Sequence, residues 1–195
     1  MDNVVKNYID NLYNNFISTI ASDLKGKEFF LNKALDKSAK MIIQANTSGK
    51  KVIFIGNGGS SAVASHKALD FWFTGKIRGL SFSDYANLTA ISNDLGYQNV
   101  FSNQIERFAD KGDILFAISS SGNSENIILA VKKARNIGCK VLTFSGFQNT
   151  NRLRKLGDLN FYTPSIHYNQ VESIDLLLCD CILEIILEHD KKKKK

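Results

Sequence analysis

The sequence predicts an α/β fold of three layers, α/β/α, with a central parallel sheet and two helices ahead of its first strand. The apolar runs at 52–55, 114–118 and 141–144 are rich in β-branched and aromatic residues and have no polar face, which is typical of strands buried in a parallel sheet. Strands and helices alternate from residue 52 onward. Because such crossovers are right-handed, the helices are expected on both faces of the sheet.

Length and composition favour one domain. The chain has 195 residues, of which 44% are hydrophobic, enough for one substantial core. We expect a single domain over residues 1–190, which includes a helical segment at 1–48, followed by a lysine tail at 191–195.

Charge and cysteine content exclude several classes of protein. The net charge is +6, but the lysine tail supplies five positive charges, so the rest is nearly neutral and nucleic-acid binding is not expected. Charged residues interrupt the first twenty positions, so neither a signal peptide nor a membrane span is predicted and the protein is expected in the cytoplasm. Cys139, Cys179 and Cys181 are predicted to be free, buried thiols.

The first 47 residues predict two amphipathic helices, at about 4–21 and 27–47, each with apolar residues at helical spacing. Neither helix belongs to a strand–helix repeat, and little sheet remains for them to cover. We therefore expect at least one of them to pack against another subunit. The alternative is a cap within the same chain.

The strand at 52–55 runs into the loop GNGGSS, which opens the next helix. Gly56, Gly58 and Gly59 allow a ligand to approach the main chain, Ser60 or Ser61 is a candidate helix cap, and a helix start attracts anions. The loop has neither the Gly-Lys-Ser/Thr of a Walker A motif nor the GxGxxG spacing. By itself it is equally consistent with a tight turn and with ligand binding.

A short strand at 80–83 and a short helix at 86–91 come next. They lead into a loop at 92–96 that contains Asn93 and Asp94, residues typical of a turn beside a glycine. A helix at 100–109 precedes the strand at 114–118.

A second polar loop follows that strand and carries Ser119, Ser120, Ser121 and Ser124 around Gly122 and Asn123. Serine hydroxyls beside the N–H groups of a helix start suit a phosphate group. A flexible linker is the alternative, but a linker rarely lies between a buried strand and an amphipathic helix. Because both loops follow strands of one parallel sheet, they are expected to form one cleft.

The remaining elements complete the alternation. A helix at 127–137 ends at Gly138, and the strand at 141–144 is followed by an asparagine-rich loop. The strand at 159–162 is predicted to lie at the edge of the sheet because Pro164 follows it, and a long helix at 170–188 closes the fold.

The motifs GNGGSSAVASH and ISSSGNSENI resemble those of the SIS (sugar isomerase) family, and within it the phosphoheptose isomerases, which convert sedoheptulose 7-phosphate to a heptose phosphate. The resemblance runs from about Val4 to the final helix and includes SND at 92–94. It implies a homo-oligomer, a tetramer by expectation, that binds a phosphorylated sugar and supplies precursors of heptose and surface polysaccharide. The residues that it assigns to the substrate are Asn57, Gly58, Gly59, Ser60, Asn93, Asp94, Ser119, Ser120, Ser121, Ser124 and Glu172.

Four side chains are candidates for the chemistry. A ketose–aldose interconversion through an enediol needs a base for a carbon-bound proton and an acid or metal for the oxyanion. His66 and Asp70 are four apart on one helix, and Glu172 and Asp180 are eight apart on another, so each pair shares a helix face. Asp180 lies in an apolar segment, where a carboxylate needs a partner.

The family pattern has a His and a Glu on the first helix and a Gln and a His on the last, used as base, acid and, in many members, zinc ligands. His66 matches, whereas Asp70, Glu172 and Asp180 replace the other three. We expect Asp70 or Glu172 as the base and His66 as the acid, and all four as a tentative site for zinc or a harder divalent cation such as manganese. The alternatives are a non-catalytic sugar-phosphate-binding or protein-bridging module, and an isomerase for a different sugar phosphate.

Overall fold

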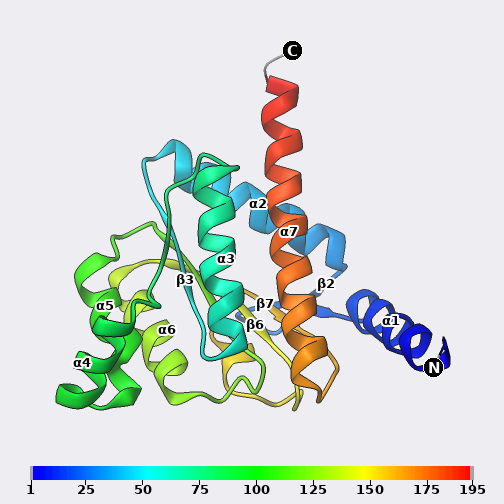
Figure 1. Ribbon diagram of the computed structural model, residues 1–195. Coiled ribbons are helices and arrows are strands. Elements are labelled where there is room, and N and C mark those ends of the chain that lie inside the picture. The colour runs from blue at the N-terminus through cyan, green and yellow to red at the C-terminus, as the bar shows by residue number, and fades with distance from the viewer. Residues whose placement is uncertain (1, 194–195) are drawn as a thin grey trace.

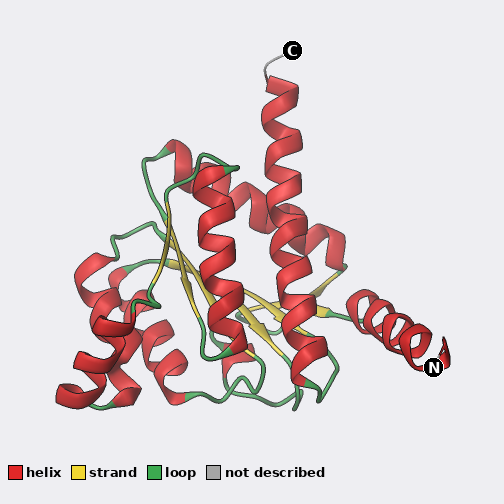
Figure 2. Ribbon diagram, in the orientation of Figure 1, coloured by secondary structure: helices red, strands yellow, loops and turns green. Residues whose placement is uncertain are grey.

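A computed structural model describes residues 2–193 as a single three-layer α/β/α unit (Figures 1 and 2). The helices are α1 (Asp2–Ile17), α2 (Leu31–Thr47), α3 (Gly59–Phe73), α4 (Tyr85–Leu95), α5 (Val100–Phe108), α6 (Glu125–Ile137) and α7 (Tyr168–Lys193). The strands are β1 (Ile20–Asp23), β2 (Glu28–Phe29), β3 (Val52–Ile55), β4 (Gly79–Ser81), β5 (Ile114–Ser119), β6 (Lys140–Ser145) and β7 (Leu159–Tyr162). The predicted fold class is confirmed.

The strands form one seven-stranded sheet in the order β2-β1-β7-β6-β5-β3-β4. The five strands from β7 to β4 are mutually parallel, whereas β1 pairs antiparallel with both β7 and β2. Every residue of β3 and β5 is buried, as their continuous apolar runs predict. In consequence, the loops after β3 and β5 leave the sheet side by side at the carboxyl edge of its parallel part.

Two hydrophobic cores lie on opposite faces of the sheet. One joins α2, α3 and α7 to the phenylalanines of four strands, and Phe144 stacks on both Phe116 and Phe161 at ring-centre distances of 5.7 and 5.1 Å. The other joins α5 and α6 to the alternate strand residues, among them Ile53, Ile55 and Leu115. Helices α3 and α7 therefore cover the same face, next to one another (Figure 1).

The N-terminal prediction is partly wrong. The first helix ends at Ile17, and Ile20 and Ala21, which were predicted to belong to it, lie in β1 of a β1–β2 hairpin. The second helix therefore begins only at Leu31. Because β1 pairs with β7, β7 is an internal strand and not the predicted edge strand. The four residues of β1 include only two apolar side chains, a pattern that fits the end of a helix as well as a strand. They form a strand because they pair with β7.

The two N-terminal helices differ in how they are buried. Helix α2 contributes Ala34, Leu35 and Ile42 to the core, as a cap within the chain would. Helix α1 buries mainly Leu12 and Phe16 and leaves an apolar row exposed to solvent: Val4, Val5, Ile9, Tyr13 and Ile17. Packing against another subunit stays a prediction, and α1 is the helix that it concerns.

The C-terminal helix α7 is longer than predicted and includes Lys191, which pairs with Glu188 at 2.6 Å. Part of the predicted lysine tail is thus helical, and residues 194–195 lie outside the described part of the chain. Among residues 2–193 no helix is both long and apolar enough to cross a bilayer.

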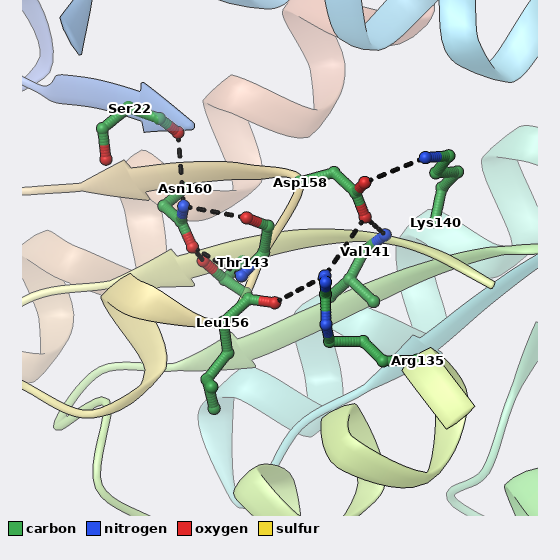
Figure 3. A network of polar contacts seen from close by, with 9 residues as sticks. Ser22, Arg135, Lys140, Val141, Thr143, Leu156, Asp158 and Asn160 are labelled. Carbon is green, nitrogen blue, oxygen red and sulfur yellow. Dashed lines mark hydrogen bonds and ion pairs between the residues drawn. The ribbon is translucent and has the colours of Figure 1, made fainter. Parts of the chain in front are cut away.

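A polar network near the amino ends of β6 and β7 joins these two strands to β1 (Figure 3). The buried amide of Asn160 accepts a hydrogen bond from Thr143 Oγ1 at 2.7 Å and donates one to the Ser22 carbonyl oxygen at 3.3 Å. Asp158 accepts from the main chain of Val141 at 2.9 Å and pairs with Lys140 at 3.1 Å. These contacts hold β1, β6 and β7 together at the end of the sheet opposite to the loops after β3 and β5.

Candidate active site

The glycine loop after β3 and the serine loop after β5 contact one another. Asn57 and Asn126 form a paired amide contact, in which each Nδ2 donates to the other's Oδ1 at 3.0 and 2.9 Å. The Tyr97 hydroxyl, which follows α4, donates to Asn57 Oδ1 at 2.8 Å. The structure therefore brings both predicted loops to one place, and a third segment reaches the same asparagine.

The glycine loop presents the start of α3 to a carboxylate. Gly58 has φ = 55°, and α3 begins at Gly59, so Ser60 lies inside the helix and neither serine caps it, contrary to prediction. A Cβ on Gly59 would lie 2.5 Å from Glu172 Cδ and 2.6 Å from its Oε1, so only glycine admits the Glu172 carboxylate there. Ser60 Oγ lies 3.4 Å from the same Oε1. A carboxylate is stabilised at a helix N-terminus.

The serine loop is held in a compact turn. Ser119 Oγ donates to Ser124 Oγ at 3.3 Å, and the Asn123 main chain donates to Ser121 Oγ at 3.2 Å. Ser120 Oγ is buried and has no hydrogen-bond partner among the described residues.

Behind this turn stands Asn151, which the sequence reasoning did not single out. Gly122 has φ = 63°, and its Cα faces Asn151 so closely that an added Cβ would lie 2.8 Å from Asn151 Cβ. The Asn151 amide nitrogen donates to Ser145 Oγ at 3.2 Å and to the carbonyl oxygen of Gln148 at 2.8 Å. Asn151 thus holds the serine loop against the loop after β6.

Farther along α3, a buried lysine binds two of the predicted catalytic carboxylates. The Lys67 side chain is 1% exposed, and its Nζ lies 2.5 Å from Asp70 Oδ2 and is bonded to Asp180 Oδ1 of α7. Burial alone would lower the pKa of Lys67, but the hydrogen bonds and charges of Asp180 and Asp70 outweigh it and raise that pKa. His66 Nε2 lies 3.4 Å from Asp70 Oδ2, and its ring is 57% exposed.

The four predicted catalytic residues therefore fall into two groups. Glu172 lies at the glycine loop, whereas His66, Asp70 and Asp180 lie with Lys67, eight residues along α3 from Gly59 or about 12 Å. If Glu172 is the base, His66, the predicted acid, is therefore not next to it.

The predicted four-ligand set for zinc or another divalent cation is not assembled. In residues 2–193 no group of three or more His, Cys, Asp or Glu side chains has the geometry to hold a metal ion. Asp70 and Asp180, which would be ligands, are engaged by the Lys67 ammonium instead. The side chains in this arrangement do not fit a metal ion.

A further carboxyl group, Asp175, lies on the core side of α7. Its side chain is fully buried, and neither oxygen has a hydrogen-bond partner among the described residues. Burial, and to a lesser extent the charge of Glu172, raises the pKa of Asp175 well above its ordinary value.

Asn93 and Asp94 are not in a loop, as predicted, but in the last turn of α4. Both are exposed, and Asn93 Nδ2 donates to Asp94 Oδ1 at 2.8 Å. Among the described hydrogen bonds it is Tyr97, three residues later, that reaches the glycine loop. A role of Asn93 and Asp94 in sugar binding stays a prediction.

Comparison with known proteins gives concordant matches. The family model described as SIS domain matches residues 13–146. The phosphoheptose isomerase of Aliarcobacter butzleri is 38% identical over 164 residues, which cover 80% of this chain and 85% of that protein. The solved phosphoheptose isomerases of Neisseria gonorrhoeae and Francisella tularensis superpose with TM-scores of 0.75 and 0.81, at 31% and 25% identity. These superpositions cover 80% and 95% of this chain, and 87% and 97% of theirs.

Proposed function

Because the chain belongs to the SIS domain family and, within it, to the phosphoheptose isomerases, we propose that it interconverts sedoheptulose 7-phosphate and an aldose heptose phosphate. The relatives that match most of the chain are named for this class of reaction. Formation of precursors for heptose-containing surface polysaccharides and a cytoplasmic location stay predictions from the sequence.

One observation carries the proposal: the Glu172 carboxylate lies against Gly59 at the start of α3, beside the junction of the two loops. We assign the phosphate group to the serine loop, because its hydroxyls lie at the start of α6, where the first N–H groups of the helix attract an anion. The sugar then extends from this loop toward Glu172.

The proposed base is Glu172. It takes the proton from C1 of the ketose, and the electron pair of that C–H bond forms the C1–C2 double bond while the C2 carbonyl oxygen takes the negative charge of an enediolate. The hydroxyl proton on O1 then moves to O2, and the proton held by Glu172 is returned at C2, which leaves an aldehyde at C1 and a hydroxyl at C2. We assign the stabilisation of the enediolate oxygen to main-chain N–H groups at the start of α3. Asp70, the other predicted base, is already paired with Lys67. His66 stays a predicted acid.

The non-catalytic alternative is not favoured. Ion pairs that held both Asp180 and Glu172 away from the loops would have supported it. Only Asp180 is in such a pair, and Glu172 is in no ion pair among the described residues. The curated relatives are also named as isomerases.

The test is turnover of sedoheptulose 7-phosphate in D₂O, followed by NMR. We expect aldose formation and loss of the C1 proton signal. Glu172→Gln should lower both rates by about 10²- to 10⁴-fold, as for loss of a general base. Ser173→Ala, at a half-buried position of α7 one residue away, is the matched control with an unchanged rate. Wild-type rates in Glu172→Gln would exclude Glu172 as the base, and no turnover by the wild type would refute the proposed reaction.

Phosphate binding is tested separately by thermal stabilisation. Sedoheptulose 7-phosphate should raise the Tm of the wild type and of Ser48→Ala, a control at the end of α2. Ser121→Ala should reduce this shift. An undiminished shift would remove the serine loop from the site.

The proposed assembly is a homotetramer, and the exposed apolar row of α1 supports association. Light scattering after gel filtration measures the mass directly. A monomer at micromolar concentration would refute this part of the proposal.

A further inference from the structure

Lys67 is a buried charge in a site that is predicted to perform acid–base chemistry. Its side chain is 1% exposed, and its buried neighbours on α3 are apolar apart from Ser60, among them Ala64, Ala68 and Phe71. A buried ammonium is costly unless oppositely charged groups surround it. The carboxylates of Asp70 and Asp180, from two different helices, supply that environment.

The same carboxylates are the oxygen donors that a divalent cation would need. Carboxylate oxygens and a histidine nitrogen are the ligands typical of zinc, and His66 Nε2 lies only 3.4 Å from Asp70 Oδ2. An ammonium already occupies the position between Asp70 and Asp180. We propose that Lys67 is the resident cation of this site and holds Asp70 and Asp180 in place of a divalent metal ion.

Electrostatics supports this assignment. Two carboxylates and one ammonium leave one excess negative charge, whereas without the lysine there would be two, so the attraction for a dication is weaker with Lys67 present. A metal ion that entered would have to displace the ammonium, which would then remain buried without its partners. The pKa of Lys67 is raised, so the ammonium form is retained.

Lys67 also acts on the histidine through Asp70. Lys67 Nζ binds Asp70 Oδ2, the oxygen that lies 3.4 Å from His66 Nε2. Lys67 therefore restrains the carboxylate that the His66 ring contacts. Lys67 is thus a positioning residue and is not expected to contact the substrate. If the proposed isomerase function is right, turnover proceeds without added divalent metal.

The experiment measures metal binding first and turnover second. Wild-type protein is dialysed against chelator, then titrated with zinc while bound metal and Tm are recorded. Wild type is expected to bind no stoichiometric zinc and to show no zinc-dependent rise in Tm. Lys67→Met should lower the Tm without zinc and bind zinc at least tenfold more tightly, because His66, Asp70 and Asp180 are released.

Two further variants serve as controls. Adding His66→Ala to Lys67→Met should cancel the gain in zinc affinity, whereas Lys67→Arg keeps the positive charge and should leave zinc affinity as weak as in the wild type.

Stoichiometric, tightly held zinc in the wild type overturns the proposal, whether or not Lys67→Met folds. Equal zinc affinity in wild type and Lys67→Met also overturns it. Turnover that disappears with chelator and returns with zinc would do the same. A wild type that binds no metal and turns over no sugar phosphate would refute the proposed reaction but leave Lys67 as the resident cation.

Discussion

The contact between Gly59 and Glu172 predicts that Gly59→Ala separates activity from stability. An added methyl group would lie 2.5 Å from Glu172 Cδ, and its nearest neighbours are all atoms of that carboxyl group. The backbone at Gly59 is outside the left-handed region, so alanine fits the helix without strain. The Glu172 side chain can rotate away, and we expect it to leave the start of α3.

Two opposing effects set the change in stability. Alanine in place of glycine stabilises a helix interior by about 0.5–1 kcal/mol, and the gain at Gly59, the first residue of α3, is at most of this size. Removing a carboxylate from a helix N-terminus costs about 0.3–1 kcal/mol. The two nearly cancel, so the Tm should change by no more than about 4 °C in a chain of this size. A base displaced by about 1 Å, in contrast, costs about 10²-fold in rate.

The assay is a double-mutant cycle with Gly59→Ala and Glu172→Ala, read out as the turnover number for sedoheptulose 7-phosphate and as Tm. In the Glu172→Ala background the methyl group has no carboxylate to displace, so Gly59→Ala should cost no further activity. A full rate in Gly59→Ala alone would refute the reasoning. An equal loss in both backgrounds would show that Gly59 acts independently of Glu172.

Three further predictions follow from buried groups. Asp175→Asn should raise the free energy of unfolding at pH 7 but not at pH 4. Because the pKa of Asp175 is raised in the folded state, the folded protein keeps a proton that the unfolded chain releases above a pH of about 3.9. The free energy of unfolding of the wild type therefore falls as the pH rises, by at most about 1.4 kcal/mol per pH unit. Denaturant unfolding at both pH values checks this, and equal differences at both would contradict it. Gly122→Ala should lower the free energy of unfolding by more than about 1 kcal/mol, because φ is 63° at this residue and the added methyl group would meet Asn151. Calorimetry should detect this change as a lower Tm. Burial raises the pKa of the Cys139 thiol to about 11, so iodoacetamide at pH 8 should leave Cys139 unmodified in the folded protein and modify it in urea; rapid labelling of the native state would be inconsistent with this burial.

Much of the fold was predictable because its signals are local. The strands β3, β5 and β6 are buried almost entirely and are therefore mostly apolar, and the loops after β3 and β5 carry their glycines and serines at the strand ends. The β1–β2 hairpin was not predictable in this way. Its strands have four and two residues, and β1 exists as a strand because it pairs with β7, which lies about 140 residues later.

The residues of the candidate site were likewise predictable only where their signal is local in the sequence. The two loops and Glu172 were identified from residue type and spacing, and the structure places them together. Lys67 was missed, since its role comes from a contact with Asp180 on another helix, 113 positions away. A signal was present: a lysine between Ala64 and Ala68 on the apolar face of α3, three residues before Asp70, is rarely left unpaired.

Three of the carboxyl groups of α7 lie in three different electrostatic environments. Glu172 lies at the N-terminus of α3, where the helix dipole stabilises its charge, and Asp180 is neutralised by Lys67. Asp175, between them in sequence, has neither a cation nor a hydrogen-bond donor beside it among residues 2–193, and its pKa is raised. Lys67 pairs with Asp70 and Asp180 at the far end of the α3–α7 contact, and among residues 2–193 Glu172 is in no ion pair. Moving the positive charge toward the loops, by Ser60→Lys for example, should therefore lower the turnover number even if the phosphate binds more tightly.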